Sequence, residues 1–256
     1  MIWSGGREKS VVARKSSSKS RKKSALDERS IAEAHPGKKV FPSDAIRLVG
    51  KYGYRARYRI DIEGLDNMPD SGPVLVLAKH QRMADVPIGL SALVEARRER
   101  KMDIWCVMKQ ELVENFAANF YLGAGGIPLN RKDPVKSKEQ LLFAREKLHA
   151  GKIVVIFPEQ TFYPWKMGKG RPGGFRFIMG KPPEPVSVLC VGFEYEKKGK
   201  PRVGLKVRIG PPKVFNPQDD HEQFLHDRML HMADLSSLEY KFDRPKGRKQ
   251  SDADLD

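Results

Sequence analysis

The middle of the chain alternates between short apolar runs and longer amphipathic stretches, whereas both ends are polar. Many of the apolar runs adjoin Gly, Pro or Asn, and they predict strands at residues 58–63, 74–78, 102–108, 127–129, 152–157, 185–195 and 202–210. The stretches between them predict helices at residues 44–55, 86–100, 110–122, 135–149, 174–179 and 219–238. Strands that alternate with helices indicate an α/β domain with a mostly parallel central sheet and helices on both sides.

The two polar ends set the expected domain limits. Residues 1–43 are rich in Ser, Lys and Arg and almost lack aromatic residues, which is typical of disorder. We therefore expect a disordered basic tail at residues 1–43, one domain at residues 44–241 and a charged tail at residues 242–256. The net charge of +16 favours an anionic partner: a phosphate-bearing small molecule, an anionic lipid surface or nucleic acid.

The apolar runs are all too short for a transmembrane helix, which needs roughly 20 residues. The first residues also lack the apolar segment of a signal peptide. These features predict a protein that is soluble or rests on a membrane surface. Cys106 and Cys190 both lie in strand-like runs, and this placement predicts two buried thiols in a reducing compartment.

The apolar run at residues 74–78 ends abruptly at Lys79 and His80, and Asp85 follows five residues after the histidine. Proteins of the α/β class bind ligands at the carboxyl ends of their strands. Histidine, with an ordinary pKa of about 6.5, is suited to act as a general base, and a nearby carboxylate can orient it. Residues five apart lie about 140° from each other around a helix. The two side chains can therefore meet only if a turn separates the strand from the helix.

Three further loops follow strand-like runs and carry polar residues. Gly126 and Arg131 lie in the first, where glycines allow a close backbone approach and the guanidinium suits phosphate; a plain surface turn is the alternative. The second holds Glu159 and Thr161, and its glutamate is either a site residue or part of a structural ion pair or helix cap. The third places Arg171 among glycines near an expected helix start, where anions bind readily.

The four segments, taken in this order, resemble the sequence blocks of the glycerolipid acyltransferase superfamily, in particular the PlsC-like 1-acyl-sn-glycerol-3-phosphate acyltransferases. The family's blocks read His-x4-Asp, Gly-x-Ile-x-x-Asp/Asn-Arg and Phe-Pro-Glu-Gly-Thr. The matching residues are His80 and Asp85; Gly125, Ile127, Asn130 and Arg131; and Phe157, Pro158, Glu159 and Thr161. A later Lys-x-Gly-Ala element is matched loosely at residues 171–174, and the resemblance covers roughly residues 57–212.

The chain also departs from the family pattern at five positions. Lys79 stands where the family usually has Asn, Arg82 where it has Ser, Gln160 where it has Gly, Phe162 where it has Arg, and Val188 where it has Pro. The His-Asp pair itself is intact. These differences therefore bear on the acceptor more than on the type of reaction.

The resemblance implies an enzyme that moves a fatty acyl group from acyl-CoA or acyl-carrier protein to a hydroxyl of a lysophospholipid-type acceptor, first of all 1-acyl-glycerol-3-phosphate. It implies that His80 is the general base and that Asp85 orients it. It implies binding of the acceptor and its phosphate by Gly126, Arg131, Glu159, Thr161 and Arg171. No metal and no cofactor besides the acyl donor are expected. The expected location is cytoplasmic, on the inner face of an anionic membrane, and nucleic acid is not an expected partner.

Two other classes of function stay open at this point. One is a non-catalytic basic protein of the same fold that binds lipid or nucleic acid, and the other is a nucleic-acid binder that uses its basic tail. A serine hydrolase and an ATP-dependent enzyme are disfavoured, because the chain has neither Gly-x-Ser-x-Gly nor a P-loop. The spacing of His221, His226 and His231 does not place them on one helix face for a metal.

Overall fold

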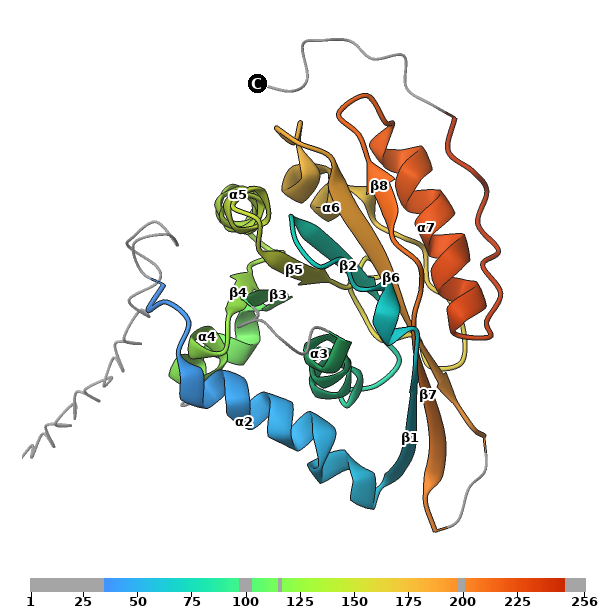
Figure 1. The fold of residues 1–256 in the computed structure, drawn as a ribbon. Coiled ribbons are helices and arrows are strands. Elements are labelled where there is room, and N and C mark those ends of the chain that lie inside the picture. Colours follow the sequence, from blue (N-terminus) through green and yellow to red (C-terminus); the bar gives the residue numbers. More distant parts are fainter. Residues whose placement is uncertain (1–34, 97–102, 115–116, 198–200, 247–256) are drawn as a thin grey trace, which may run out of the picture.

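The computed structural model describes residues 35–96, 103–114, 117–197 and 201–246. Its strands form one eight-stranded sheet with helices on either side (Figure 1). The strands are β1 (Tyr58–Glu63), β2 (Val74–Ala78), β3 (Ile104–Lys109), β4 (Gly126–Leu129), β5 (Ile153–Ile156), β6 (Val186–Tyr195), β7 (Val203–Ile209) and β8 (Lys213–Phe215). The helices are α2 (Val40–Lys51), α3 (Asp85–Ala96), α4 (Ala118–Gly123), α5 (Pro134–His149), α6 (Pro172–Met179) and α7 (His221–Leu235).

The sheet has the strand order β1-β7-β6-β2-β5-β3-β4, and β8 pairs with β6. The five strands from β6 to β4 are parallel, whereas β7 and β8 run antiparallel to β6. Every residue of β2 and β5 is buried, which explains why both strands are continuous apolar runs. The prediction of a mostly parallel α/β sheet with helices on both sides is confirmed.

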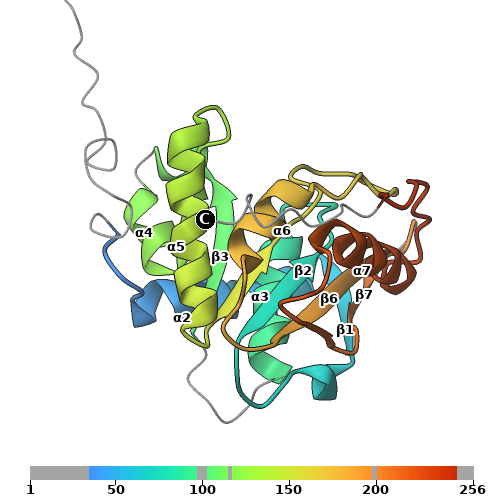
Figure 2. The ribbon, with the colours of Figure 1, turned by 90° about the horizontal axis from the view of Figure 1, so that it is seen from above.

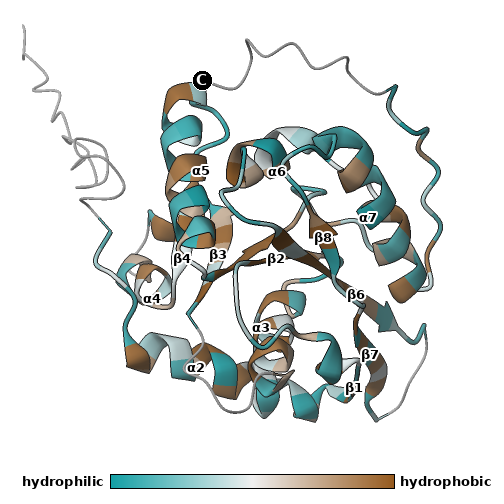
Figure 3. Cartoon of the chain, turned by 45° about the horizontal axis from the view of Figure 1, so that its top comes forward, coloured by the Kyte–Doolittle hydropathy of each residue, from teal (hydrophilic) through white to brown (hydrophobic). Residues whose placement is uncertain are grey.

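The sheet separates two hydrophobic layers because neighbouring residues of a strand point to opposite faces. Leu75 and Leu77 of β2 pack with residues of α5, α6 and α7, whereas Val74 and Val76 pack with residues of α3. Seen from above, α5, α6 and α7 cover one face and α3 lies beneath the sheet (Figure 2). The apolar colouring is concentrated on the central strands (Figure 3).

Helices α2 and α3 approach each other closely at one glycine. A side-chain carbon added to Gly50 would lie 1.9 Å from the carbonyl oxygen of Pro87 and 3.1 Å from Ser91. Only a residue without a side chain fits there, because the obstacle is backbone. This contact fixes α2 against the helix that begins with Asp85.

Several elements differ from the sequence prediction. Helix α2 begins at Val40 instead of residue 44, because Pro42 lies in its first turn, where a backbone N–H is not needed. The single helix predicted at residues 110–122 is instead a 3₁₀ turn, Gln110–Val113, and the short helix α4. Strand β8 was not predicted, because its three residues contain one buried side chain and show no alternation.

The predicted tails lie largely outside the described residues, and the described residues include 35–43, which precede the predicted boundary at residue 44. The ring of His35 packs on Trp105 and Phe143, at centroid distances of 5.2 and 5.5 Å, and its Nε2 lies 3.0 Å from the carbonyl oxygen of Gly126. Both cysteines are buried free thiols, as predicted. Within the described ranges, we find no helix with the length and apolar character needed to cross a bilayer.

Candidate active site

The candidate site forms at the carboxyl ends of β2 and β5, which are neighbours in the sheet. These strands are parallel, and Leu77 pairs with Ile156 in their register. The residues that follow both strands therefore leave the sheet side by side. This places the His80 segment next to the Glu159 segment, although the two are 79 residues apart in the sequence.

His80 and Asp85 face each other across a short turn, as their spacing requires. The backbone N–H of Asp85 donates to the carbonyl of Arg82 over 3.1 Å, and this turn brings the start of α3 back toward the histidine. The Nδ1 atom of His80 lies 3.6 Å from Oδ2 of Asp85. The imidazole is 14% exposed, whereas the carboxylate is fully buried. The predicted meeting of the two side chains is confirmed as geometry.

Three donors fix the orientation of the Asp85 carboxylate. Its Oδ2 accepts hydrogen bonds from the backbone N–H groups of Gln81 and Arg82, over 2.6 and 2.7 Å. Its Oδ1 accepts a hydrogen bond from the hydroxyl of Tyr195 at the end of β6. Burial, and then the charge of Asp85, raise the pKa of Tyr195, so this hydroxyl stays protonated and donates. The carboxylate is thus held with one oxygen toward His80.

Aromatic rings enclose the imidazole of His80. Phe157 lies 4.4 Å away and Phe162 lies 4.1 Å away, measured between ring centroids. Phe162 stands where the family pattern has Arg, so an apolar ring covers the histidine at this position. Close by, the guanidinium of Arg82 stacks over the rings of Tyr195 and Trp165, at 4.4 and 5.4 Å.

Glu159 forms a buried ion pair with Lys79. The Nζ atom of Lys79 lies 2.9 Å from Oε1 and 2.7 Å from Oε2, and both side chains have zero exposure. Burial lowers the pKa of Lys79 and raises the pKa of Glu159, and the attraction between the two charges opposes both shifts. Of the two possibilities that the sequence left open for Glu159, the described contacts are those of an ion pair within the chain.

The remaining predicted site residues divide into two groups. Nη1 of the exposed Arg131 donates to the carbonyl of Gln160 over 2.5 Å, so the β4 loop reaches the β5 loop. Thr161 and Arg171 are exposed on the segment that follows β5, and the N–H of Arg171 donates to the carbonyl of Pro158. Arg131, Thr161 and Arg171 therefore lie at the same end of the sheet as His80, where the parallel strands finish.

Gly126 lies elsewhere. It pairs with Cys106, which in turn pairs with Val155, so Gly126 is level with the interior of β5 and not with its end. A side-chain carbon at Gly126 would meet Met108 at 2.5 Å and the carbonyl of Tyr121 at 2.7 Å. The structure therefore does not bring Gly126 together with the other candidate residues, and its lack of a side chain serves packing.

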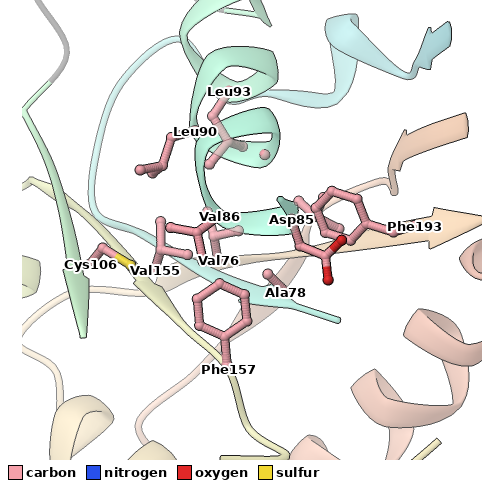
Figure 4. Close-up of a pocket in the computed structure, with 12 residues that line it drawn as sticks. Val76, Ala78, Asp85, Val86, Leu90, Leu93, Cys106, Val155, Phe157 and Phe193 are labelled. Carbon is pink, nitrogen blue, oxygen red and sulfur yellow. The ribbon is translucent and has the colours of Figure 1, made fainter. Parts of the chain in front are cut away.

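A small apolar cavity of about 10 Å³, roughly the room that one water molecule needs, lies beside Asp85 (Figure 4). Asp85 and Phe193 lie at one end, Cys106 lies at the other, and the ring of Phe157 stands between them. The cavity runs between α3 and the sheet, and its lining consists of Val76, Ala78, Asp85, Val86, Gly89, Leu90, Leu93, Cys106, Val155, Phe157, Val191 and Phe193. Burial raises the pKa of Cys106 to about 12, so its thiol is neutral. The lining beside Asp85 is thus almost wholly apolar, and the space within it is about the size of one water molecule.

Sequence reasoning missed two contributors to this site. Tyr195 lies 110 residues after Asp85, and its only sequence signal is its place at the end of a long apolar strand. Gln81 is buried, donates through Nε2 to the carbonyl of Phe193 and accepts from the N–H of Trp165, over 2.5 and 2.9 Å. Among the described residues, no three His, Cys, Asp or Glu side chains gather so that they could hold a metal ion.

The fold agrees with what the comparisons with known proteins show. Residues 59–181 match the model of the acyltransferase family, and this segment contains all four predicted loops. This segment therefore matches an acyltransferase, and the chain is similar there to the PlsC-like glycerolipid acyltransferases.

Particular relatives are two plant enzymes and one bacterial structure. The chain is 31% identical over 120 residues to the chloroplastic 1-acyl-sn-glycerol-3-phosphate acyltransferase LPAT1 of Arabidopsis thaliana, covering 46% of this chain and 31% of that protein. It is 28% identical over 139 residues to the chloroplastic 1-acyl-sn-glycerol-3-phosphate acyltransferase BAT2 of Brassica napus, covering 53% of this chain and 38% of that protein. The chain thus spans only about a third of the length of these relatives.

The crystal structure of the 1-acyl-sn-glycerophosphate acyltransferase PlsC from Thermotoga maritima superposes with a TM-score of 0.54. The match covers 73% of this chain and 75% of that one at 21% sequence identity, so it concerns the fold.

Proposed function

We propose that the protein transfers a fatty acyl group from acyl-CoA or acyl-carrier protein to a free hydroxyl of a lysophospholipid-type acceptor, with 1-acyl-glycerol-3-phosphate as the first candidate. The observation that carries this proposal is the His80–Asp85 pair, with 3.6 Å between Nδ1 and Oδ2, beside an apolar cavity. The relatives' names support the acceptor, since both plant proteins are 1-acyl-sn-glycerol-3-phosphate acyltransferases.

The proposed reaction uses His80 twice. Because Nδ1 faces Asp85, Nε2 is the atom that removes the proton from the acceptor hydroxyl. The hydroxyl oxygen attacks the thioester carbon, the new C–O bond forms, and the C–S bond breaks. The departing thiolate then takes the proton from the imidazolium. Asp85 stabilises the imidazolium meanwhile, and the apolar side chains between α3 and the sheet would have to move apart to admit the acyl chain.

The acceptor's phosphate is proposed to bind near Arg131 and Arg171. Both side chains are exposed, and both lie on segments that contact the β5 loop, at Gln160 and Pro158. A guanidinium can bind phosphate through two parallel hydrogen bonds. Arg131→Ala should therefore raise the KM for the phosphorylated acceptor more than the KM for the acyl donor, and Arg131→Lys should restore part of the loss.

A peripheral position on an anionic membrane is proposed from helix α2. Its exposed apolar residues are Val40, Phe41, Leu48, Val49 and Tyr52 at its C-cap, with exposures between 47% and 79%. Phe41, Leu48 and Tyr52 share one helix face at about 100° per residue, opposite the buried Gly50. Flotation with anionic phospholipid vesicles tests this surface. Phe41→Ser combined with Leu48→Ser should weaken binding, and equal binding of that variant would place the membrane surface elsewhere.

The decisive test of the activity uses purified protein, radiolabelled acyl-CoA or acyl-carrier protein, and 1-acyl-glycerol-3-phosphate. Wild type should form the diacyl product. His80→Ala should lower turnover by about 10²–10⁴-fold while keeping the same melting temperature. Acyl transfer that survives His80→Ala would refute the mechanism. If wild type binds lipid but transfers no acyl group from either donor, the non-catalytic alternative is correct.

A further inference from the structure

Lys79 is the largest of the fully buried side chains that the described residues contain. Lysine is almost never fully buried unless its charge is paired. Its ammonium contacts both oxygens of Glu159, and also the carbonyls of Tyr163 and His80 at 3.1 and 3.4 Å. All of these partners belong to the two segments that build the candidate site. The Lys79 ammonium therefore connects the segment that carries His80 to the loop that follows β5.

That loop encloses His80. The N–H of Tyr163 donates to the carbonyl of His80 over 3.0 Å, and the N–H of His80 faces Oε2 of Glu159 at 3.3 Å. Between these two contact points lies Phe162, whose ring covers the imidazole at 4.1 Å. The position of Phe162 therefore depends on the hydrogen bonds at both ends of the segment from Glu159 to Tyr163.

The contacts of Glu159 are all made within the chain. Besides Lys79 and the N–H of His80, its Oε1 accepts a hydrogen bond from the N–H of Gly168 over 2.5 Å. Both oxygens have zero exposure together with the rest of the side chain. An acceptor molecule would have to break this network to reach the carboxylate.

We propose that Lys79 is a positioning residue for the reaction and that Glu159 acts with it, not as an acceptor ligand. The ammonium holds Glu159 and the Tyr163 carbonyl, which keeps Phe162 against the imidazole and keeps Nδ1 of His80 toward Asp85. The inference rests on the proposed function. It assigns a role to a residue at which this chain departs from the family pattern, and it changes the role that the resemblance implies for Glu159.

The choice of variants follows from the burial of the pair. Removing one partner leaves an uncompensated buried charge and strongly destabilises a protein, whereas replacing both by neutral side chains is often tolerated. The main variant is therefore Lys79→Met with Glu159→Gln, in which the amide oxygen still accepts from the N–H groups. Glu159→Gln alone is the second variant; its amide oxygen still accepts from the ammonium, and its melting temperature is measured because the Lys79 charge loses its counter-charge. Lys213→Met is the matched control, because that lysine pairs with Asp227 at 3.9 Å on the surface.

The readouts are kcat, the KM of each substrate, and the NMR signals of the His80 imidazole in protein labelled at its six histidines. A misplaced catalytic group should lower kcat about ten- to a hundredfold. We expect this loss in the double variant and in folded Glu159→Gln, both with unchanged acceptor KM and with displaced or broadened His80 signals. The Lys213→Met control should match wild type in all three.

Two results would overturn the proposal. One is a folded double variant, or a folded Glu159→Gln, with wild-type kcat and an unchanged His80 signal. The other is a large rise in acceptor KM at constant kcat, because that would make Glu159 an acceptor ligand. The NMR readout needs no turnover. It therefore still reports on Lys79 if the His80→Ala experiment shows that the proposed mechanism is wrong.

Discussion

Replacing Tyr195 by Phe removes a single oxygen atom from the surroundings of Asp85. The hydroxyl donates to Oδ1, while Oδ2 keeps its two backbone donors from Gln81 and Arg82. The ring should stay in place, because it packs against Tyr58 at 5.7 Å and under the guanidinium of Arg82 at 4.4 Å. The substitution therefore tests one hydrogen bond to a fully buried carboxylate.

The expected cost follows from that burial. Hydrogen bonds to charged groups contribute about 1.5–3 kcal/mol, and the orphaned oxygen finds no solvent. The free energy of unfolding should fall by this amount, which lowers the melting temperature by roughly 3–12 °C for a domain of this size. Because one of the three bonds that orient Asp85 is lost, kcat/KM should fall about tenfold if the active-site pair shifts by a fraction of an ångström.

Urea denaturation and steady-state acyl transfer measure the two effects, and Tyr54→Phe is the control. The ring of Tyr54 packs on Tyr58 at 6.3 Å, away from Asp85, so its hydroxyl should matter little. If Tyr195→Phe keeps both the stability and the kcat/KM of wild type, the hydroxyl does not hold Asp85 and the reasoning is refuted.

Three further predictions concern other parts of the chain. Gln160 has a φ of 60°, a conformation that costs a non-glycine residue about 1–2 kcal/mol. After subtraction of the entropy that glycine loses on folding, Gln160→Gly should stabilise the protein by about 0.5–1 kcal/mol, whereas Gln160→Ala should not. Urea denaturation of the two variants tests this difference. Burial lowers the pKa of four histidines below 6.5, so the unfolded chain binds more protons and stability is lost as the pH falls through about 6.5. These histidines are His35, His149, His221 and His231. The melting temperature should be lower below that pH than above it, and equal melting temperatures would contradict the prediction. If the acyl chain enters between α3 and the sheet, Leu90→Phe should obstruct its path and lower kcat/KM for long acyl donors more than for short ones, and an unchanged chain-length profile would show that the acyl chain lies elsewhere.

The elements that the sequence predicted well are those whose signal is local. Strands β2 and β5 are continuous apolar runs because both their faces are covered, and helix α5 has Asp133 as its N-cap and Pro134 in its first turn. The meeting of His80 with Asp85 was also predictable, since only four residues separate them. In each case the sequence signal lies within about a dozen neighbouring residues.

The contacts that the sequence did not reveal join distant segments. Lys79 and Glu159 are 80 residues apart, and Tyr195 is 110 residues from Asp85. Their pairing depends on the order of β6, β2 and β5 in the sheet, which no local pattern encodes. In the sequence, Lys79 in particular resembles a solvated charge at a strand end. Its burial depends on the Glu159 carboxylate, which the fold brings beside it.

The glycine contact between α2 and α3 has a mechanical consequence. Because Gly50 admits no side chain against Pro87, these helices form one stiff unit, and the second helix begins with Asp85. If a bilayer binds the exposed apolar face of α2, as proposed above, it would therefore set the tilt of the candidate site relative to the lipid plane. A bulkier residue at position 50 would change that tilt without contacting any of the candidate site residues.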